Sequence, residues 1–299
     1  MPAETAALPR VRLLGDGIVY AGPMRPGHTV RQSATLLCAV DGAPFTVDCE
    51  GQTVAAPALL VRPMVRKAVL SGSRPMVLID LEPHHAHYRS FHGVPHPGVQ
   101  ALPPPAAARF ADLAQRLSHG LLAGHALDAQ AHAIAQAVAR SLPPPAPLDE
   151  RVRMLMALLD EDPGAELERL APHVGISPHH ASRLFNQGLG LSMRRYALSV
   201  KIRAAASFMG SDLPLTQIAQ AAGFVDSAHF ARVWMQCYGH APSQFFQPDR
   251  VQLDSTDQPD WLMWYLARRD RSLPSRGPDA QTPWIHRRAA PGAVRTDAA

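Results

Sequence analysis

Two stretches of the chain decide its fold: LERLAPHVGISPHHASRLF at residues 167–185 and LTQIAQAAGFVDSAHFARVW at residues 215–234. Both contain an apolar residue followed by Ala, a glycine four residues after that Ala, and then an arginine with an aromatic residue two positions later. A second glycine lies seven residues beyond each arginine, and another aromatic residue six beyond that glycine. A repeat of this kind indicates that one structural unit occurs twice.

Each copy has the pattern of two helices joined by a tight turn. Gly175 and Gly223 permit the left-handed backbone that such a turn needs. Ser177 can cap the helix that follows, with Pro178 at its first position, and Asp226 or Ser227 is the candidate cap in the second copy. The outward positions are then His179, His180, Ser182 and Arg183 in the first copy and Ser227, Ala228, Ala231 and Arg232 in the second. This is the pattern of a helix-turn-helix, whose second helix enters the major groove of DNA.

Between the copies, the apolar spacing predicts one continuous helix over residues 192–209. Such a helix is about 25 Å long at 1.5 Å per residue. With the widths of the flanking helices added, the two recognition helices come to lie about one DNA turn, roughly 34 Å, apart.

These segments, with GLSMRRYALSVKIRAAASFM at residues 190–209 and YGHAPSQFF at residues 238–246, resemble the AraC/XylS family of bacterial transcription regulators. The resemblance covers about residues 166–246 and implies sequence-specific binding of double-stranded DNA by two helix-turn-helix motifs, with RNA polymerase as a further partner. It leaves open whether the protein activates or represses transcription, although activators are common in the family. By this alignment the family's base-contacting positions are His179, Ser182 and Arg183, then Ser227, Ala228, Ala231 and Arg232.

Arg183 and Arg232 are the strongest candidates for direct readout, because arginine pairs with guanine O6 and N7 through two hydrogen bonds. A surface salt bridge or a phosphate contact is the alternative role for either. Arg194, Arg195 and Lys201 are expected to contact the DNA backbone or to serve the structure.

The chain departs from the family pattern in several places. Asn186, Met235 and Phe246 stand where the family commonly has a basic residue, and Lys201 where it usually has Arg. Fewer cations predict fewer phosphate contacts and a shallower salt dependence of DNA binding. Pro172 lies inside the first motif's leading helix, where it removes a hydrogen bond and is expected to bend the helix.

The N-terminal half has a different pattern. Short apolar stretches at residues 35–40, 45–49, 58–61 and 76–81 alternate with turn dipeptides such as Asp41-Gly42 and Glu50-Gly51, which is typical of antiparallel hairpins. Helical spacing follows between Phe110 and Val138. We therefore predict an α+β chain of two domains. The first is a small antiparallel, cupin-like β-barrel with two helices, and the second is an all-α double helix-turn-helix with a long linker helix.

The prolines at residues 143–147 mark the expected boundary between these domains. Residues 1–142 form a sensing or dimerising domain in this interpretation, 143–147 a linker and 148–250 the DNA-binding domain. Residues 251–299 are expected to be a mostly disordered tail, with an apolar patch at residues 261–266 that docks or stays free. A fragment that begins at Leu148 is expected to bind DNA by itself as a monomer.

Histidines cluster after the stretch at residues 76–81. His84, His85 and His87 are weak candidates for metal ligands, since closely spaced imidazoles can share zinc, nickel or copper. The alternative is a solvated loop without a metal. Two other functions stay open beside DNA-dependent regulation: a metal-dependent cupin-type enzyme fused to a helical module, and a non-specific architectural DNA-binding protein.

Composition narrows the class further. The formal net charge is +4 over 299 residues, and the three cysteines form no CxxC pair, which argues against a disulfide scaffold. We find no phosphate-binding loop, nucleophile elbow or HExxH pattern, so no enzyme activity and no cofactor are expected. No secretory signal or membrane span is apparent, and we expect a cytoplasmic protein. A small-molecule effector and a homodimer are the further partners that the architecture allows.

Overall fold

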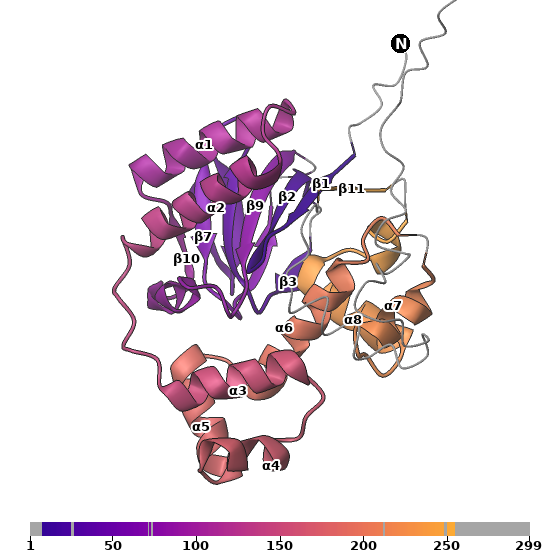
Figure 1. Cartoon of the computed structure of the whole chain (residues 1–299). Coiled ribbons are helices and arrows are strands. Elements are labelled where there is room, and N and C mark those ends of the chain that lie inside the picture. Colours follow the sequence, from indigo (N-terminus) through magenta and orange to yellow (C-terminus); the bar gives the residue numbers. More distant parts are fainter. Residues whose placement is uncertain are drawn as a thin grey trace, which may run out of the picture.

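The computed structural model describes residues 8–24, 27–70, 72, 74–211, 213–247 and 250–254. Within them, an N-terminal β-sandwich with two covering helices is followed by two helical units (Figure 1). The predicted α+β class is confirmed. None of the described helices is both long enough and apolar enough to cross a membrane.

Two sheets make up the N-terminal part. The larger one runs, in spatial order, through β10 (Val99–Ala101), β7 (Ala58–Val61), β4 (Ala34–Ala39), β9 (Pro75–Leu81), β2 (Gly17–Pro23), β1 (Arg10–Leu13) and β11 (Gln252–Asp254). The smaller one runs through β3 (His28–Val30), β8 (Arg66–Val69), β5 (Phe45–Cys49) and β6 (Gln52–Ala56). The four stretches predicted as strands are β4, β5, β7 and β9. All neighbouring strands are antiparallel except β1 and β11.

Side-chain alternation explains how the larger sheet is buried on both faces. Along β4, Leu37 and Ala39 belong to the core between the sheets, whereas Leu36 and Cys38 belong to the core beneath the covering helices. A strand covered on both faces needs apolar residues at nearly every position, which is why residues 34–39 are all apolar except Thr35.

The sheet does not close into the barrel that we predicted. Among the described strands, no ladder joins the edges β10 and β11 of the larger sheet to the edges β3 and β6 of the smaller one. The two inner faces instead pack on a common core. Beside β3 this core continues into helix α8 (Ser227–Tyr238) of the C-terminal part (Figure 1). Packing against a helix buries the open side without any further strand pairing.

Helices follow the strands in the predicted order. Those over the outer face of the larger sheet are α1 (Pro104–Ser118) and α2 (Gly124–Ala139), and a 3-10 helix, η1 (Tyr88–Gly93), precedes them. Residues 143–149 have no regular structure. The helical units contain α3 (Glu150–Glu161), α4 (Leu167–Leu170), η2 (Ala171–Val174), α5 (Pro178–Leu189), α6 (Met193–Ala206), α7 (Leu215–Ala221), α8 and η3 (Pro242–Gln244).

The linker helix is shorter than predicted. We expected a continuous helix over residues 192–209, but α6 ends at Ala206 and a turn follows that includes Gly210 with φ +70°. Its 14 residues span about 21 Å. The apolar residues Phe208 and Met209, which suggested a longer helix, are buried from this turn.

The two helical units are held differently. The first has a core of its own, which includes Leu155, Phe185 and Tyr196. The second does not, because Trp234 and Phe245 share one cluster with the inner faces of both sheets. One apolar core therefore contains residues from both sides of the proline segment 143–147. The domain limits given above remain a proposal.

The end of the described chain returns to the first strand. Gln252–Asp254 forms β11 and pairs in parallel with β1, so the tail predicted as mostly disordered from residue 251 begins with an ordered strand. Arg12 is the reason, because its guanidinium bonds Asp128 of α2 at 2.6 Å and Asp254 at 3.2 Å. The apolar patch at residues 261–266 lies outside the described residues.

The shared core predicts how an isolated C-terminal fragment behaves. In residues 148–250, Trp234 is the only tryptophan, and removal of the sandwich exposes its apolar neighbours. We expect its fluorescence emission to shift to longer wavelength than in residues 1–254, which contain the same single tryptophan. If the fragment unfolds cooperatively and has the same emission maximum as residues 1–254, Trp234 does not depend on the sandwich for its burial, and the shared core is wrong.

Candidate nucleic-acid interface

The first helix-turn-helix is built as its sequence predicts. The α-helical part of its leading helix stops at Leu170 and the chain continues as η2, because Pro172 has no N–H to donate. Gly175 then takes φ +67°, which reverses the chain. Ser177 Oγ accepts a hydrogen bond from the backbone N–H of His180 at 3.3 Å and so caps α5, with Pro178 at the first position.

The second helix-turn-helix repeats this construction. Gly223 has φ +81° after α7, and one additional residue lengthens the turn before the next helix. Of the two candidate caps, Asp226 is the one used, since its carboxylate accepts a hydrogen bond from His229 N–H at 2.6 Å. The caps Ser177 and Asp226 are 49 residues apart, and α5 and α8 have 12 residues each. The two recognition helices can thus be compared position by position.

The predicted outward residues lie on accessible faces of these helices. His179 and Arg183 are exposed on α5, with His180 and Ser182 half-buried beside them. On α8, Ala228 and Arg232 are exposed, and Ser227 and Ala231 are half-buried. Their assignment to DNA bases remains a prediction.

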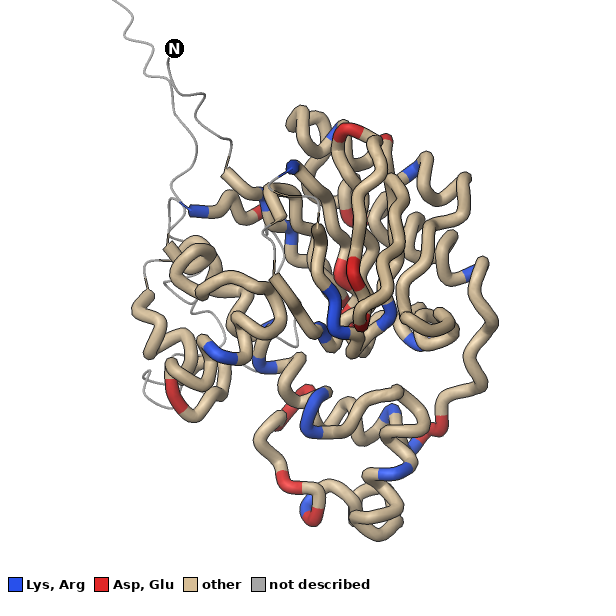
Figure 2. Tube along the Cα trace, turned by 180° about the vertical axis from the view of Figure 1, so that it is seen from behind, with Lys and Arg blue, Asp and Glu red and all other residues tan. Residues whose placement is uncertain are grey.

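The linker helix α6 presents further cations. Arg194 and Arg195 are exposed in its first turn, and Lys201 is half-buried. Arg195 Nη1 lies 3.9 Å from Met64 Sδ of the sandwich. Figure 2 shows basic and acidic positions interspersed along the chain of the first unit. This distribution suits contacts at a few phosphates better than a broad electrostatic surface.

Comparison with known proteins agrees with this geometry. A family model described as a helix-turn-helix domain matches residues 170–248. The arabinose operon regulatory protein of Escherichia coli strain K12 is 32% identical over 114 residues, which cover 37% of this chain and 38% of that protein. The chain carries an AraC-type helix-turn-helix domain.

Two further proteins are similar over a longer part of the chain, at lower sequence identity. The transcriptional activator NphR of Rhodococcus is 25% identical over 241 residues, covering 77% of this chain and 70% of that protein. ToxT from Vibrio cholerae O395 is similar in structure, with a TM-score of 0.52 and 12% identity over 75% of this chain and 95% of that one. At that identity the likeness shows the fold alone. The matched part covers well under half the length of the arabinose operon protein, so the activity of the whole chain is a proposal.

A buried arginine of the sandwich holds the second half of the AraC-type domain. Arg31 bonds Asp80 of β9 at 2.5 Å and donates through Nε to the backbone oxygen of Cys237 on α8 at 2.9 Å. Its guanidinium carbon also lies 5.1 Å from the ring centroid of Tyr238, a cation–π distance. Asp80 accepts a second bond from Thr35 Oγ1 at 2.7 Å. Both charged groups are therefore paired inside the protein.

A pocket lies at this junction, and its empty space, open solvent included, is about 440 Å³. Tyr20 and Leu78 line it from the larger sheet, and Trp234 and Phe245 from the AraC-type domain. Arg31 and Asp80 are its charged members. Among the described residues, no acceptor lies within hydrogen-bond distance of the buried Trp234 Nε1. The lining of the cavity is thus mainly apolar.

Two more ionisable groups are buried close to this pair. Burial lowers the pKa of Lys67 to about 7, and the neighbouring charge of Arg31 acts in the same direction. Lys67 Nζ donates to Thr35 Oγ1 at 3.3 Å. Burial raises the pKa of Glu82 to about 7. Burial therefore brings the pKa values of both groups close to neutral pH, beside the Arg31–Asp80 pair.

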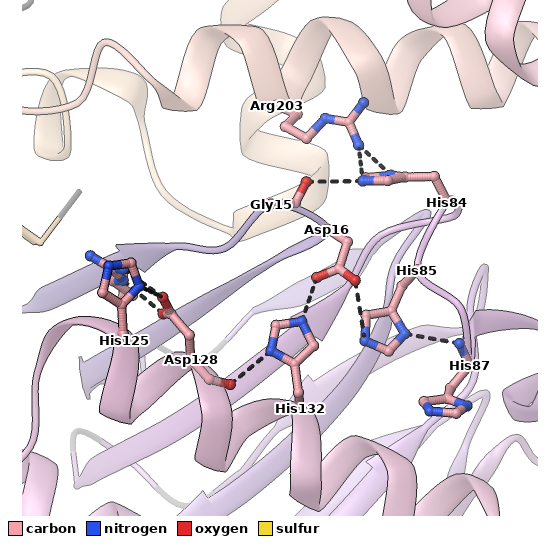
Figure 3. A network of polar contacts seen from close by, with 10 residues as sticks. Gly15, Asp16, His84, His85, His87, His125, Asp128, His132 and Arg203 are labelled. Atoms are coloured by element: carbon pink, nitrogen blue, oxygen red, sulfur yellow. Dashed lines mark hydrogen bonds and ion pairs between the residues drawn. The ribbon is translucent and has the colours of Figure 1, made fainter. Parts of the chain in front are cut away.

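The histidines singled out in the sequence separate into different contacts (Figure 3). His84 bonds the backbone oxygen of Gly15 at 3.1 Å and contacts Arg203 of α6, which also reaches Asp160 of α3 at 3.4 Å. The loop after β9 thus touches the linker helix of the AraC-type domain.

His85 lies instead beside Asp16 and His132, whose side chains sequence analysis did not select. The ligand atoms of these three residues lie within 4.8 Å of one another. His85 Nδ1, however, accepts a hydrogen bond from the backbone N–H of His87 at 3.0 Å, which places the proton of the neutral ring on Nε2. That N–H points toward Asp16 Oδ2, 3.6 Å away, and cannot act as a metal ligand in this form. The arrangement fits an ion-paired carboxylate between two imidazoles better than a metal.

The pKa values agree with such an ion pair. The hydrogen bond to Asp16 raises the pKa of His132 to about 9 against the effect of burial. Burial alone raises the pKa of Asp16, but the bond from His132 and the charges of the imidazoles outweigh it and leave the pKa lowered. Burial lowers the pKa of His85 to about 4, so that ring is neutral at pH 7.

The residues at the domain junction were not among those predicted from the sequence. Asp80 is the one charged residue in the strand PMVLIDL, and a lone acid in an apolar strand is a usable signal for a buried pair. Arg31, 49 positions earlier, gives no such signal, nor does His132, which is 116 positions from Asp16. Only the folded chain brings these partners together.

Removal of the Arg31 side chain tests the junction. Arg31→Ala leaves Asp80 buried without its cation and frees the Cys237 carbonyl, so we expect the free energy of unfolding to fall by about 3–5 kcal/mol. Denaturant unfolding followed by circular dichroism measures it. Arg153→Ala, which removes an exposed pair with Glu150, is the control and should cost less than about 1 kcal/mol. Equal effects of the two variants would refute the proposed role of Arg31.

The Asp16–His132 pair predicts a pH dependence of stability. Because the pKa of His132 is raised from 6.5 to about 9 on folding, its stabilisation is complete below about pH 6.5 and disappears as the pH rises through 9. In Asp16→Asn, we expect the free energy of unfolding to change less between pH 6.5 and 9 than in the wild type. His119→Gln, a change at an exposed histidine, is the control. An unaltered pH profile in Asp16→Asn would show that the pair is not formed.

Proposed function

We propose that this protein is a sequence-specific DNA-binding transcription regulator. Its two recognition helices enter successive major grooves on one face of the duplex, about one turn apart. The observation that carries the proposal is the matched construction of α5 and α8, each capped by a side chain and each presenting an exposed arginine six residues after the cap. The likeness of residues 170–248 to a helix-turn-helix domain supports it.

In this proposal the residues fall into two groups. The base readers are His179, His180, Ser182 and Arg183 of the first motif and Ser227, Ala228, Ala231 and Arg232 of the second. Arg194, Arg195 and Lys201 contact phosphates. The protein acts in the cytoplasm, contacts RNA polymerase and has no catalytic role; dimerisation would occur through the N-terminal part.

We further propose that the cavity at the junction receives a small effector. It is mainly apolar, and its charged members Arg31 and Asp80 connect the sandwich to α8. An occupant there contacts the sheet and the second helix-turn-helix at once. It can therefore change DNA affinity by favouring one arrangement of the two over another.

The test is selection of bound duplexes from a random DNA pool by the full-length protein at two salt concentrations. Two enriched sequence patches about ten base pairs apart are the expected result. Retention that depends on salt but enriches no sequence would instead support an architectural role. Absence of retention, with and without a library of small effectors, would refute DNA binding.

Arginine variants give a sharper result on the selected duplex. Arg183→Ala should relax base preference in one patch and Arg232→Ala in the other, each with a loss of about 1–3 kcal/mol of discrimination. Competition binding against duplexes changed in a single patch measures this. Arg109→Ala, at an exposed position of α1, is the control. A uniform loss of affinity for all sequences would assign these arginines to phosphates.

A further inference from the structure

We propose that the two recognition helices read DNA by different chemistry. The first uses hydrogen bonds, and the second reads mainly the C5-methyl groups of thymine through an apolar face. This inference rests on the proposed function and adds to it the class of base sequence that the second motif selects.

The proposal follows from a comparison of equivalent positions. Counted from the caps Ser177 and Asp226, the side chains directed outward stand two, five, six and nine residues along each helix. In α5 these positions hold His179, Ser182, Arg183 and Asn186, and in α8 they hold Ala228, Ala231, Arg232 and Met235. Every member of the first set can form a hydrogen bond, but only arginine can in the second, where Ser227 at the first position of α8 is the one other polar residue among the proposed base readers.

The apolar members of the second set are accessible. Met235 is 44% exposed, and Val225, which directly precedes the cap, is 88% exposed. The equivalent residue before the first cap, Ile176, is instead packed against the core of its own unit. Val225 before α8 and Met235 near its end are thus exposed apolar side chains, with Ala228 and Ala231 between them in the sequence, and the buried core uses neither Val225 nor Met235.

This face is directed away from the rest of the protein. Phe230, Trp234 and Cys237 of α8 are buried toward the sandwich, whereas Ala228, Arg232 and Met235 follow one another at four and three residues on the opposite side. The contact that fixes α8 to β3 therefore leaves its reading face accessible.

Thymine is the base that such a face fits. It alone among the four bases carries a methyl group in the major groove, and alanine and other apolar side chains contact it there. Arg232, in the middle of the face, supplies one charged contact to guanine or phosphate and favours DNA over an uncharged apolar partner. The second motif is therefore expected to select a T-rich patch next to a guanine, and the first motif a patch read by hydrogen bonds.

Replacement of thymine by uracil tests this directly, because uracil lacks only the methyl group. In the selected duplex, the patch that depends on Arg232 is identified first with Arg232→Ala, and each patch is then synthesised with uracil. We expect binding to the uracil form of the Arg232-dependent patch to weaken roughly fourfold for each contacted methyl. The same change in the other patch should leave affinity within about twofold. Equal sensitivity of both patches, or of neither, would overturn the proposal.

A transplanted face provides the second test. The variant Ala228→His, Ala231→Ser and Met235→Asn gives α8 the outward residues of α5, at positions that do not contribute to the buried core. Circular dichroism and denaturant unfolding check that it folds like the wild type. It should lose the response to uracil and prefer a changed sequence in that patch only. If the wild type binds DNA but the variant keeps both the sensitivity to uracil and the preferred sequence of that patch, the exposed face of α8 does not read DNA, and a protein partner becomes the alternative. If the wild type binds no duplex, the proposed function fails instead.

Discussion

The buried bond network of Arg31 is the interaction on which the rest of the structure depends. One guanidinium, 5% exposed, pairs with a carboxylate inside the sandwich and with a backbone oxygen on the second recognition helix. Burial of a charge is costly unless it is paired and hydrogen-bonded, so this arrangement defines where α8 can lie. The apolar cluster around Trp234 then completes the contact, and the sandwich needs no further strand on that side.

This junction makes the two helical units unequal. The first has its own core and a connection without regular structure at residues 143–149. It touches the sandwich through polar contacts such as Arg203 with His84 and through Leu191, which is buried in the cluster beneath the covering helices. The second is part of the sandwich core. The junction cavity is therefore lined by the second unit and by the sandwich, whereas the first unit packs on its own core.

The two recognition helices have the same construction but different outward side chains. Caps, turn glycines and inward aromatic residues are shared, because they maintain the fold of each copy. Outward positions are free of that constraint, and the copies differ there: three polar groups in the first correspond to two alanines and a methionine in the second. The polar network around Asp16 is separate from the recognition helices. The raised pKa of His132 and the lowered pKa of Asp16 fit an ion pair that joins α2 to the loop before β2.

The sequence by itself determined the local features. Capping residues, Pro172, the glycine turns and the alternation of four strands depend on contacts within a few residues, and the repeat showed that the helical unit occurs twice. It placed the end of α6 three residues too late because apolar spacing does not distinguish a helix from a buried turn. Only the tertiary structure decided that the sheets stay open, that β11 pairs with β1 and that Arg31 meets Asp80 and Cys237. Those contacts join residues 49 to 242 positions apart, and their selection depends on packing of the whole chain, which no local pattern records.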